Sequence, residues 1–148
     1  MTLVILALVG TVLGSIVGTF WYSPHTPMGR LHMKSIGFDK LSKDEQEKCM
    51  KDAKPHMPKM YAGQMILSFL TSFATVFIVS MSLQNGMSFA AAIGFVCLNW
   101  LCFMVPVNGS NIIWGNVDRE IAWPKFFSDI FSNLVIILLI AVLTYLFI

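Results

Sequence analysis

Residues 3–21 read LVILALVGTVLGSIVGTFW and contain no charged side chain. A helix needs about 20 apolar residues to cross the roughly 30 Å hydrocarbon layer of a membrane. Three further stretches meet this requirement without Lys, Arg, Asp or Glu in their central turns: residues 61–83, 89–107 and about 126–148. The sequence therefore predicts an all-α fold, an integral membrane four-helix bundle.

Positively charged residues are confined to two of the connections between these stretches. Eight of the ten Lys and Arg residues lie between residues 30 and 59, and the other two are Arg119 and Lys125. With four crossings, the connections 22–60 and 108–125 share one side of the membrane. Lys and Arg in short loops mark the cytoplasmic side. We therefore expect both connections in the cytoplasm and both termini on the opposite side, in a membrane that the sequence does not identify.

The composition separates this chain from soluble proteins. Of its 148 residues, 56% are hydrophobic and 12% are charged, whereas a soluble domain has about 25% charged residues. This favours a single membrane domain over residues 1–148, in contact with the lipid bilayer. The net charge is only +2, and acidic residues are interleaved with the basic ones. That pattern is not typical of nucleic-acid binding, so we expect no nucleic-acid partner.

Small residues recur on one face of the first predicted helix. Gly10, Gly14 and Gly18 are four residues apart, so they share a helix face and form a seam that another backbone can approach closely. Such seams commonly serve helix packing in lipid, where the hydrophobic effect does not drive association. We expect a packing role, either between copies of the chain or inside one copy.

Polar side chains mark the second, third and fourth predicted helices. Gln64, Ser68, Thr71 and Thr75 follow one another at steps of four, three and four, while Asn99 and Asn133 lie in the later spans. One interpretation is that the hydroxyls bond to carbonyls of their own helix and the amides join neighbouring helices. The other is that all six line a hydrated path, which requires them to converge on one cavity.

The connection 22–60 carries signals for short amphipathic helices at the membrane surface. Thr26 is suited to cap a helix with Pro27 at its first position and Gly37 beyond its end. Ser42 and Glu45 form a capping box, and Pro55 ends the helix that follows. We expect these two helices to form a cytoplasmic cap over residues 22–60.

No pattern of catalytic or metal-binding residues stands out. The spacing of His25, His32 and His56 matches no known set of metal ligands. No phosphate-binding loop, nucleophile elbow or paired-carboxylate site is visible, so we expect no catalytic residue, metal or cofactor. An interfacial lipid enzyme would need a cleft that joins the charged residues 118–120 to one of these histidines.

The stretch Trp21-Tyr22-Ser23-Pro24 ends the first predicted helix. With this box the chain resembles the domain-of-unknown-function 1761 family of small membrane proteins. The resemblance implies four helices, an aromatic-rich stretch in the third and a Trp just before the fourth, here residues 100–103 and Trp123; the family pattern has Gly at position 102, where this chain has Cys. It implies no activity. The box suits an interface anchor, because Trp and Tyr favour the headgroup level and proline ends the helix.

These observations favour a non-enzymatic membrane module that assembles with itself or with another membrane protein. The alternative is a small channel or carrier for a neutral or weakly polar solute, and the third interpretation is the interfacial lipid enzyme. The spans lack an ionisable group at depth, which argues against proton-coupled transport. The solute, the partner and the oligomeric number are not readable from the sequence.

Overall fold

The computed structural model describes residues 2–115 and 118–148, and within them it contains helices and no strand. Its elements are α1 (Thr2–Trp21), α2 (Pro27–Ser35), the 3-10 turn η1 (Phe38–Lys40), α3 (Lys43–Ala53), α4 (Met57–Gln84), α5 (Phe89–Asn99), the π-helical segment η2 (Trp100–Met104), α6 (Val105–Ile113) and α7 (Arg119–Phe147). Four spans are long and apolar enough to cross a membrane: α1, α4, the continuous run α5–η2–α6, and α7. The predicted all-α membrane fold is therefore confirmed.

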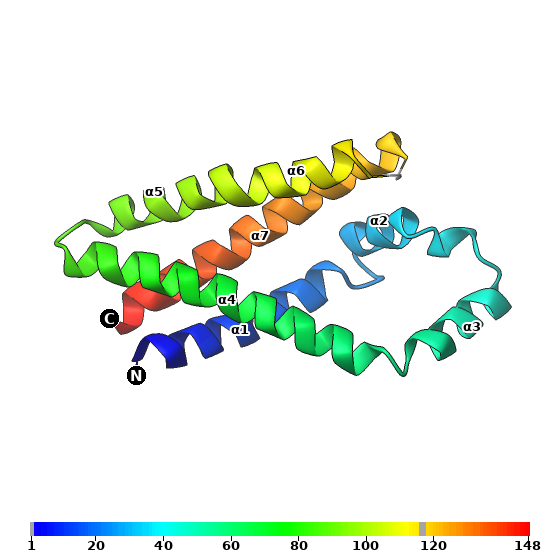
Figure 1. Ribbon diagram of the computed structural model, residues 1–148, viewed down its shortest axis with the longest axis horizontal. Coiled ribbons are helices and arrows are strands. Elements are labelled where there is room, and N and C mark those ends of the chain that lie inside the picture. Colours follow the sequence, from blue (N-terminus) through cyan, green and yellow to red (C-terminus); the bar gives the residue numbers. More distant parts are fainter. Residues whose placement is uncertain (1, 116–117) are drawn as a thin grey trace.

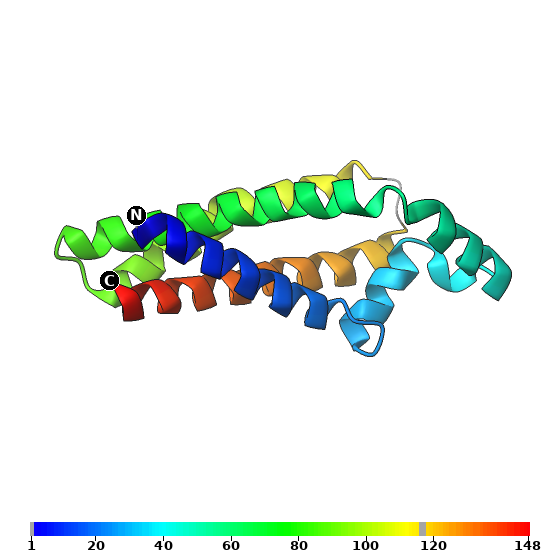
Figure 2. The same cartoon turned by 90° about the horizontal axis from the view of Figure 1, so that it is seen from below.

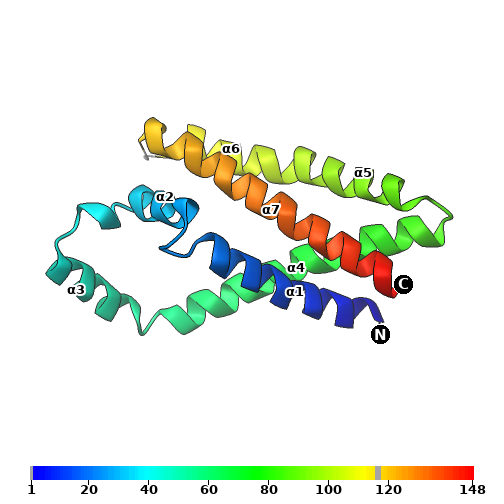
Figure 3. The same cartoon turned by 180° about the vertical axis from the view of Figure 1, so that it is seen from behind.

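The two ends of the molecule differ in character. Both termini and the turn between α4 and α5 lie at one end, which we call the terminal end (Figure 1). The short helices α2 and α3, the end of α6 and the start of α7 lie at the opposite end, which we call the cap end (Figure 3). The two charged connections therefore share one end of the bundle, as four crossings require.

Three of the spans are longer than the hydropathy of the sequence indicates. Helix α4 begins at Met57 and α7 at Arg119, and the third span continues to Ile113 rather than ending at 107. Hydropathy marks only the part of a helix that lies in hydrocarbon, whereas its backbone bonds continue into the interface. Asp118 caps α7 by accepting from the Glu120 N–H at 3.1 Å, so Pro124 lies inside this helix.

A π-helical segment interrupts the third span. The Val105 N–H donates to the carbonyl of Trp100, five residues back. Pro106 follows directly, and a proline ring clashes with the carbonyl four residues before it in an α-helix. Widening the preceding turn moves that carbonyl away, which gives η2 a physical cause and lets the span continue through the proline.

The local signals for caps and turns are confirmed. Thr26 accepts from the Gly29 N–H with Pro27 in the first turn of α2, and Ser42 and Glu45 form a complete capping box for α3. Gly37 and Gly86 both adopt positive φ, 71° and 75°. These are the positions at which the chain leaves α2 and turns between α4 and α5.

The apolar core lies toward the terminal end. Leu6, Val76 and Ile140 form one buried cluster where α1, α4 and α7 meet, and a second joins α4, α5 and α7 around Val79 and Val96. All buried residues of α4 fall between residues 72 and 82. Toward the cap end α4 moves away from α1 and α7 (Figure 2), so its first half is not part of the core.

Candidate functional site

The end of α1 is tied to the first turns of α7 by polar side chains. Trp21 Nε1 donates to Ser128 Oγ at 3.1 Å, and the Tyr22 hydroxyl donates to Asp129 Oδ1 at 2.7 Å. Lys125 pairs with the other oxygen of Asp129. We call these five residues the interfacial clasp. The i,i+4 spacing of Lys125 and Asp129 made their pairing readable from the sequence, whereas their contact with Tyr22 was not.

The clasp holds rather than reacts. Burial raises the pKa of Tyr22 above its usual value near 10, and the hydrogen bond to Asp129 and its charge raise it further. The phenol therefore stays protonated and remains a donor. The carboxylate of Asp129 receives this donor together with the Lys125 ammonium, and both side chains are mostly buried. The protonated phenol and the carboxylate with its two donors thus form a structural contact between α1 and α7.

Helix α2 docks on this clasp through its smallest residue. A Cβ on the buried Gly29 would lie 1.9 Å from the Ser23 carbonyl oxygen, so the backbone of α2 rests directly on the backbone after α1. Thr26 Oγ1 lies 2.7 Å from the Trp21 carbonyl oxygen and 2.8 Å from that of Ser23. The Trp21–Pro24 box thus contacts both α7 and α2.

His32 completes this contact. Its ring meets the Tyr22 ring edge-on, with centroids 5.4 Å apart, and its Nδ1 is buried without a hydrogen-bond partner among the described residues. Burial lowers the pKa of His32, the nearby Lys125 lowers it further, and Asp129 acts in the opposite direction. A neutral ring therefore suits this position. Sequence reasoning had grouped His32 with His25 and His56, which are exposed.

The glycines of the predicted seam face different surroundings. A Cβ on Gly10 would lie 3.2 Å from Ile140 and 3.4 Å from Ser72, and one on Gly14 would lie 3.1 Å from Ile136. Both positions are close contacts inside the chain, with α7 and α4. Gly18 has no atom within 4 Å of such a Cβ, so the seam opens toward the cap end.

The six predicted lining residues do not share a cavity among those that the structure shows. Thr71 donates to the Leu67 carbonyl and Thr75 to that of Thr71, each four residues back. Gln64 donates to Ser68 at 3.3 Å on an exposed face. The bonds of Thr71 and Thr75 are of the kind that the packing interpretation expects, in which hydroxyls bond to carbonyls of their own helix. Asn133 is half-buried in α7, and only Asn99 of the six lines a groove.

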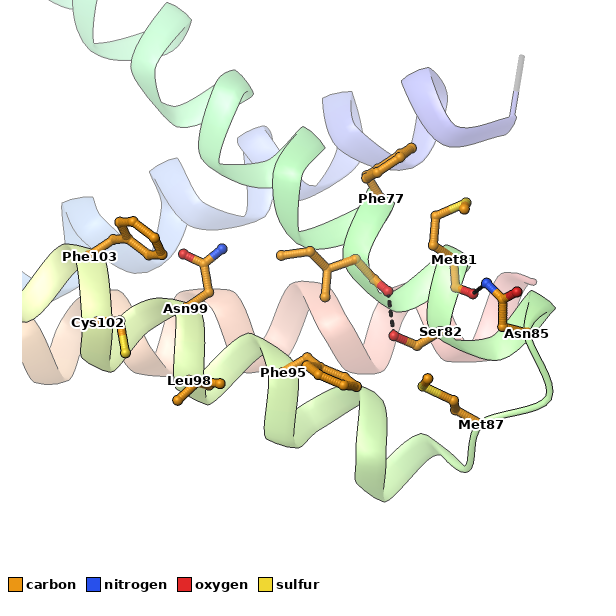
Figure 4. Close-up of a pocket in the computed structure, with 11 residues that line it drawn as sticks. Phe77, Met81, Ser82, Asn85, Met87, Phe95, Leu98, Asn99, Cys102 and Phe103 are labelled. Carbon is orange, nitrogen blue, oxygen red and sulfur yellow. Dashed lines mark hydrogen bonds between the residues drawn. The ribbon is translucent and has the colours of Figure 1, made fainter.

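That groove lies between α4 and the third span, along α5 and η2. It has a volume of about 590 Å³ and a mostly apolar lining. Phe77 and Met81 come from α4, Phe95 and Leu98 from α5, and Cys102 and Phe103 from η2 (Figure 4). Asn99 projects into it between these groups, and in the described part of the chain its amide makes no side-chain hydrogen bond.

The charged residues proposed for an interfacial enzyme lie apart from the histidine contact. Asp118, Arg119 and Glu120 are all exposed. The charged groups that act on His32 are Lys125 and Asp129 instead. Across residues 2–115 and 118–148, no three His, Cys, Asp or Glu side chains are grouped to hold a metal ion.

Comparison with known proteins adds a family and no activity. The family model described as "Protein of unknown function (DUF1761)" matches residues 5–145. No curated protein and no solved structure matches the chain.

Proposed function

Because the chain belongs to the DUF1761 family, whose function is unknown, we propose a role from its own geometry. Residues 1–148 form one non-enzymatic membrane domain that assembles with itself or with another membrane protein. The observation that carries this proposal is the amide of Asn99, which faces an apolar groove between α4 and the third span and makes no side-chain hydrogen bond among the described residues.

A partner helix can satisfy the hydrogen-bonding groups of Asn99. Its two donors and its acceptor cannot be satisfied by hydrocarbon, and an unpaired amide in an apolar medium is costly by about 2–7 kcal/mol. Side chains of this type commonly bond between helices in membranes. A helix that enters the groove with a polar group at the same depth would satisfy the amide.

The burial of the spans supports the same proposal. Only 11% of the most apolar window of the third span is buried, against 22%, 33% and 28% for α1, α4 and α7. The groove of about 590 Å³ next to Asn99 is a recess that side chains of a partner helix can fill with close contacts. The third span is therefore the face that a partner covers.

Site-specific photo-crosslinking in native membranes tests the proposal. A photoreactive phenylalanine replaces Phe103, which is 68% exposed in the groove, or Phe131, which is 54% exposed on α7 outside it. We expect protein adducts from position 103 and mainly lipid adducts from position 131. Lipid adducts alone from both positions would overturn the assembly proposal.

We also propose that the cap end faces the cytoplasm. All ten Lys and Arg residues belong to the segments 30–59 and 119–125, and such residues in short connections favour the cytoplasmic side. Cys49 is exposed in α3 and serves as a reporter in a Cys97→Ser, Cys102→Ser background. A membrane-impermeant maleimide should label it only after cells are permeabilised; labelling in intact cells would reverse the orientation.

A further inference from the structure

We propose that the groove beside Asn99 receives a second copy of this chain, with the amides of the two Asn99 residues hydrogen-bonded to each other across a twofold axis parallel to the membrane normal. This inference rests on the proposed assembly function and names its partner. It follows from the depth of Asn99, from the chemistry of an amide and from the lining of the groove.

Asn99 lies near the middle of the hydrocarbon layer. It is the eleventh residue of the run from Phe89 to Ile113, and a rise of 1.5 Å per residue places it about 15 Å from the start of that run. The hydrocarbon layer is roughly 30 Å thick. Acyl chains offer no donor or acceptor at this depth. A polar group on another membrane-spanning segment at the same depth can satisfy Asn99.

A second copy supplies such a group without further conditions. Two chains with the same membrane orientation carry Asn99 at the same depth. An amide has both donors and an acceptor, so two amides related by a twofold axis can each donate to the other. A contact of this kind is closed, because the same patch is used on both copies.

The lining of the groove is compatible with contact between identical faces. None of the residues that line it is charged, so two copies meet without like-charge repulsion. Leu98 and Phe103 are 55% and 68% exposed on either side of Asn99, which makes them available to interdigitate. Alongside, α5 exposes Ala90 and Gly94, four residues apart, where a second backbone can come close.

Self-association measured by energy transfer between labelled chains in lipid vesicles, at several protein-to-lipid ratios, tests the inference. We expect Asn99→Leu to weaken association about tenfold, the effect of one interhelical amide contact, and Asn99→Gln to retain most of it. Asn133→Leu is the matched control, because Asn133 is also half-buried in a span and lies outside the groove. It should leave association unchanged.

The outcomes separate the two proposals. Association that survives Asn99→Leu, or that falls equally with Asn133→Leu, overturns the paired amides while leaving assembly in place. A wild-type chain that stays monomeric in vesicles, yet gives photo-adducts at position 103 with a mass other than twice its own, overturns the second copy and keeps the assembly with another protein. Unchanged unfolding of Asn99→Leu checks that the variant folds, since the Asn99 amide makes no side-chain bond within the described chain.

Discussion

At the scale of single residues, close approach and unmet hydrogen bonds distinguish a few positions from the apolar background. Gly29 permits α2 to rest on the Trp21–Pro24 box, because any Cβ there would overlap the Ser23 carbonyl. Tyr22 joins the same box to Asp129. Asn99 is the opposite case, a polar group in the groove that makes no side-chain hydrogen bond within the described chain.

Gly29→Ala tests the first of these contacts. The added Cβ would lie 1.9 Å from a backbone oxygen, so α2 must shift, and we expect a loss of about 1–3 kcal/mol in stability, typical of overpacking. Gly63→Ala is the control, because a Cβ there meets no atom within 4 Å and alanine favours a helix over glycine. Thermal unfolding of both variants in lipid discs makes the comparison. Equal stability of the two variants would contradict the docking of α2 on the box.

At the scale of elements, α2 is held by a neutral histidine. The groups around His32 are Tyr22 at its edge, and Lys125 and Asp129 from α7. The docked state has a lowered pKa for His32. Above the usual histidine pKa of about 6.5, neither the docked nor the released helix binds a proton there. Below it, the released helix gains a proton that the docked helix does not, so docking weakens.

Hydrogen exchange of the α2 amides, expressed as protection factors at pH 7.5 and pH 5, measures this linkage. We expect protection to fall as the pH drops below about 6.5. His32→Phe keeps the edge contact with Tyr22 and should remove the pH dependence, whereas His25→Phe, at an exposed position, should keep it. A pH dependence that persists unchanged in His32→Phe would rule out this histidine as its source.

The same elements show what could be read from the sequence. Signals confined to a few neighbouring residues were sufficient for the caps at Thr26 and Ser42 and for the end of α2 at Gly37. Hydropathy found four spans but ended the third at residue 107, whereas the span continues to Ile113, and it gave no sign of the π-helical segment η2 before Pro106. The π-helical segment depends on the position of a backbone carbonyl relative to the ring of Pro106. Hydropathy carries no information about backbone geometry.

The candidate sites were less predictable because they arise from contacts between distant segments. The box at Trp21–Pro24 stood out by composition, but its contacts with Ser128 and Asp129 join residues 107 positions apart. Periodicity placed Gln64 to Thr75 on one stripe without showing that Thr71 and Thr75 bond within their own helix. The sequence placed Asn99 inside the third predicted span, and only the structure shows that its side chain lies in a groove.

At the scale of the whole molecule, the bundle is packed toward the terminal end and open along the third span. The buried clusters join α1, α4, α5 and α7, while the clasp and α2 fix the end of α1 near the cap end. The groove between α4 and η2 is bounded by helices on both sides (Figure 4). A packed bundle with an open groove along its third span fits a surface that receives another helix.

The most direct test of this account is crosslinking at Cys102, a native, exposed cysteine in the groove three residues after Asn99. A short bis-maleimide is added to native membranes that carry the chain with Cys49→Ser and Cys97→Ser. The control chain also has Cys102→Ser and carries Val142→Cys, at an exposed position on α7. We predict a crosslinked species of twice the chain mass from position 102 and none from position 142. No dimer from position 102, or equal amounts from both positions, would contradict the claim that two copies meet at this groove.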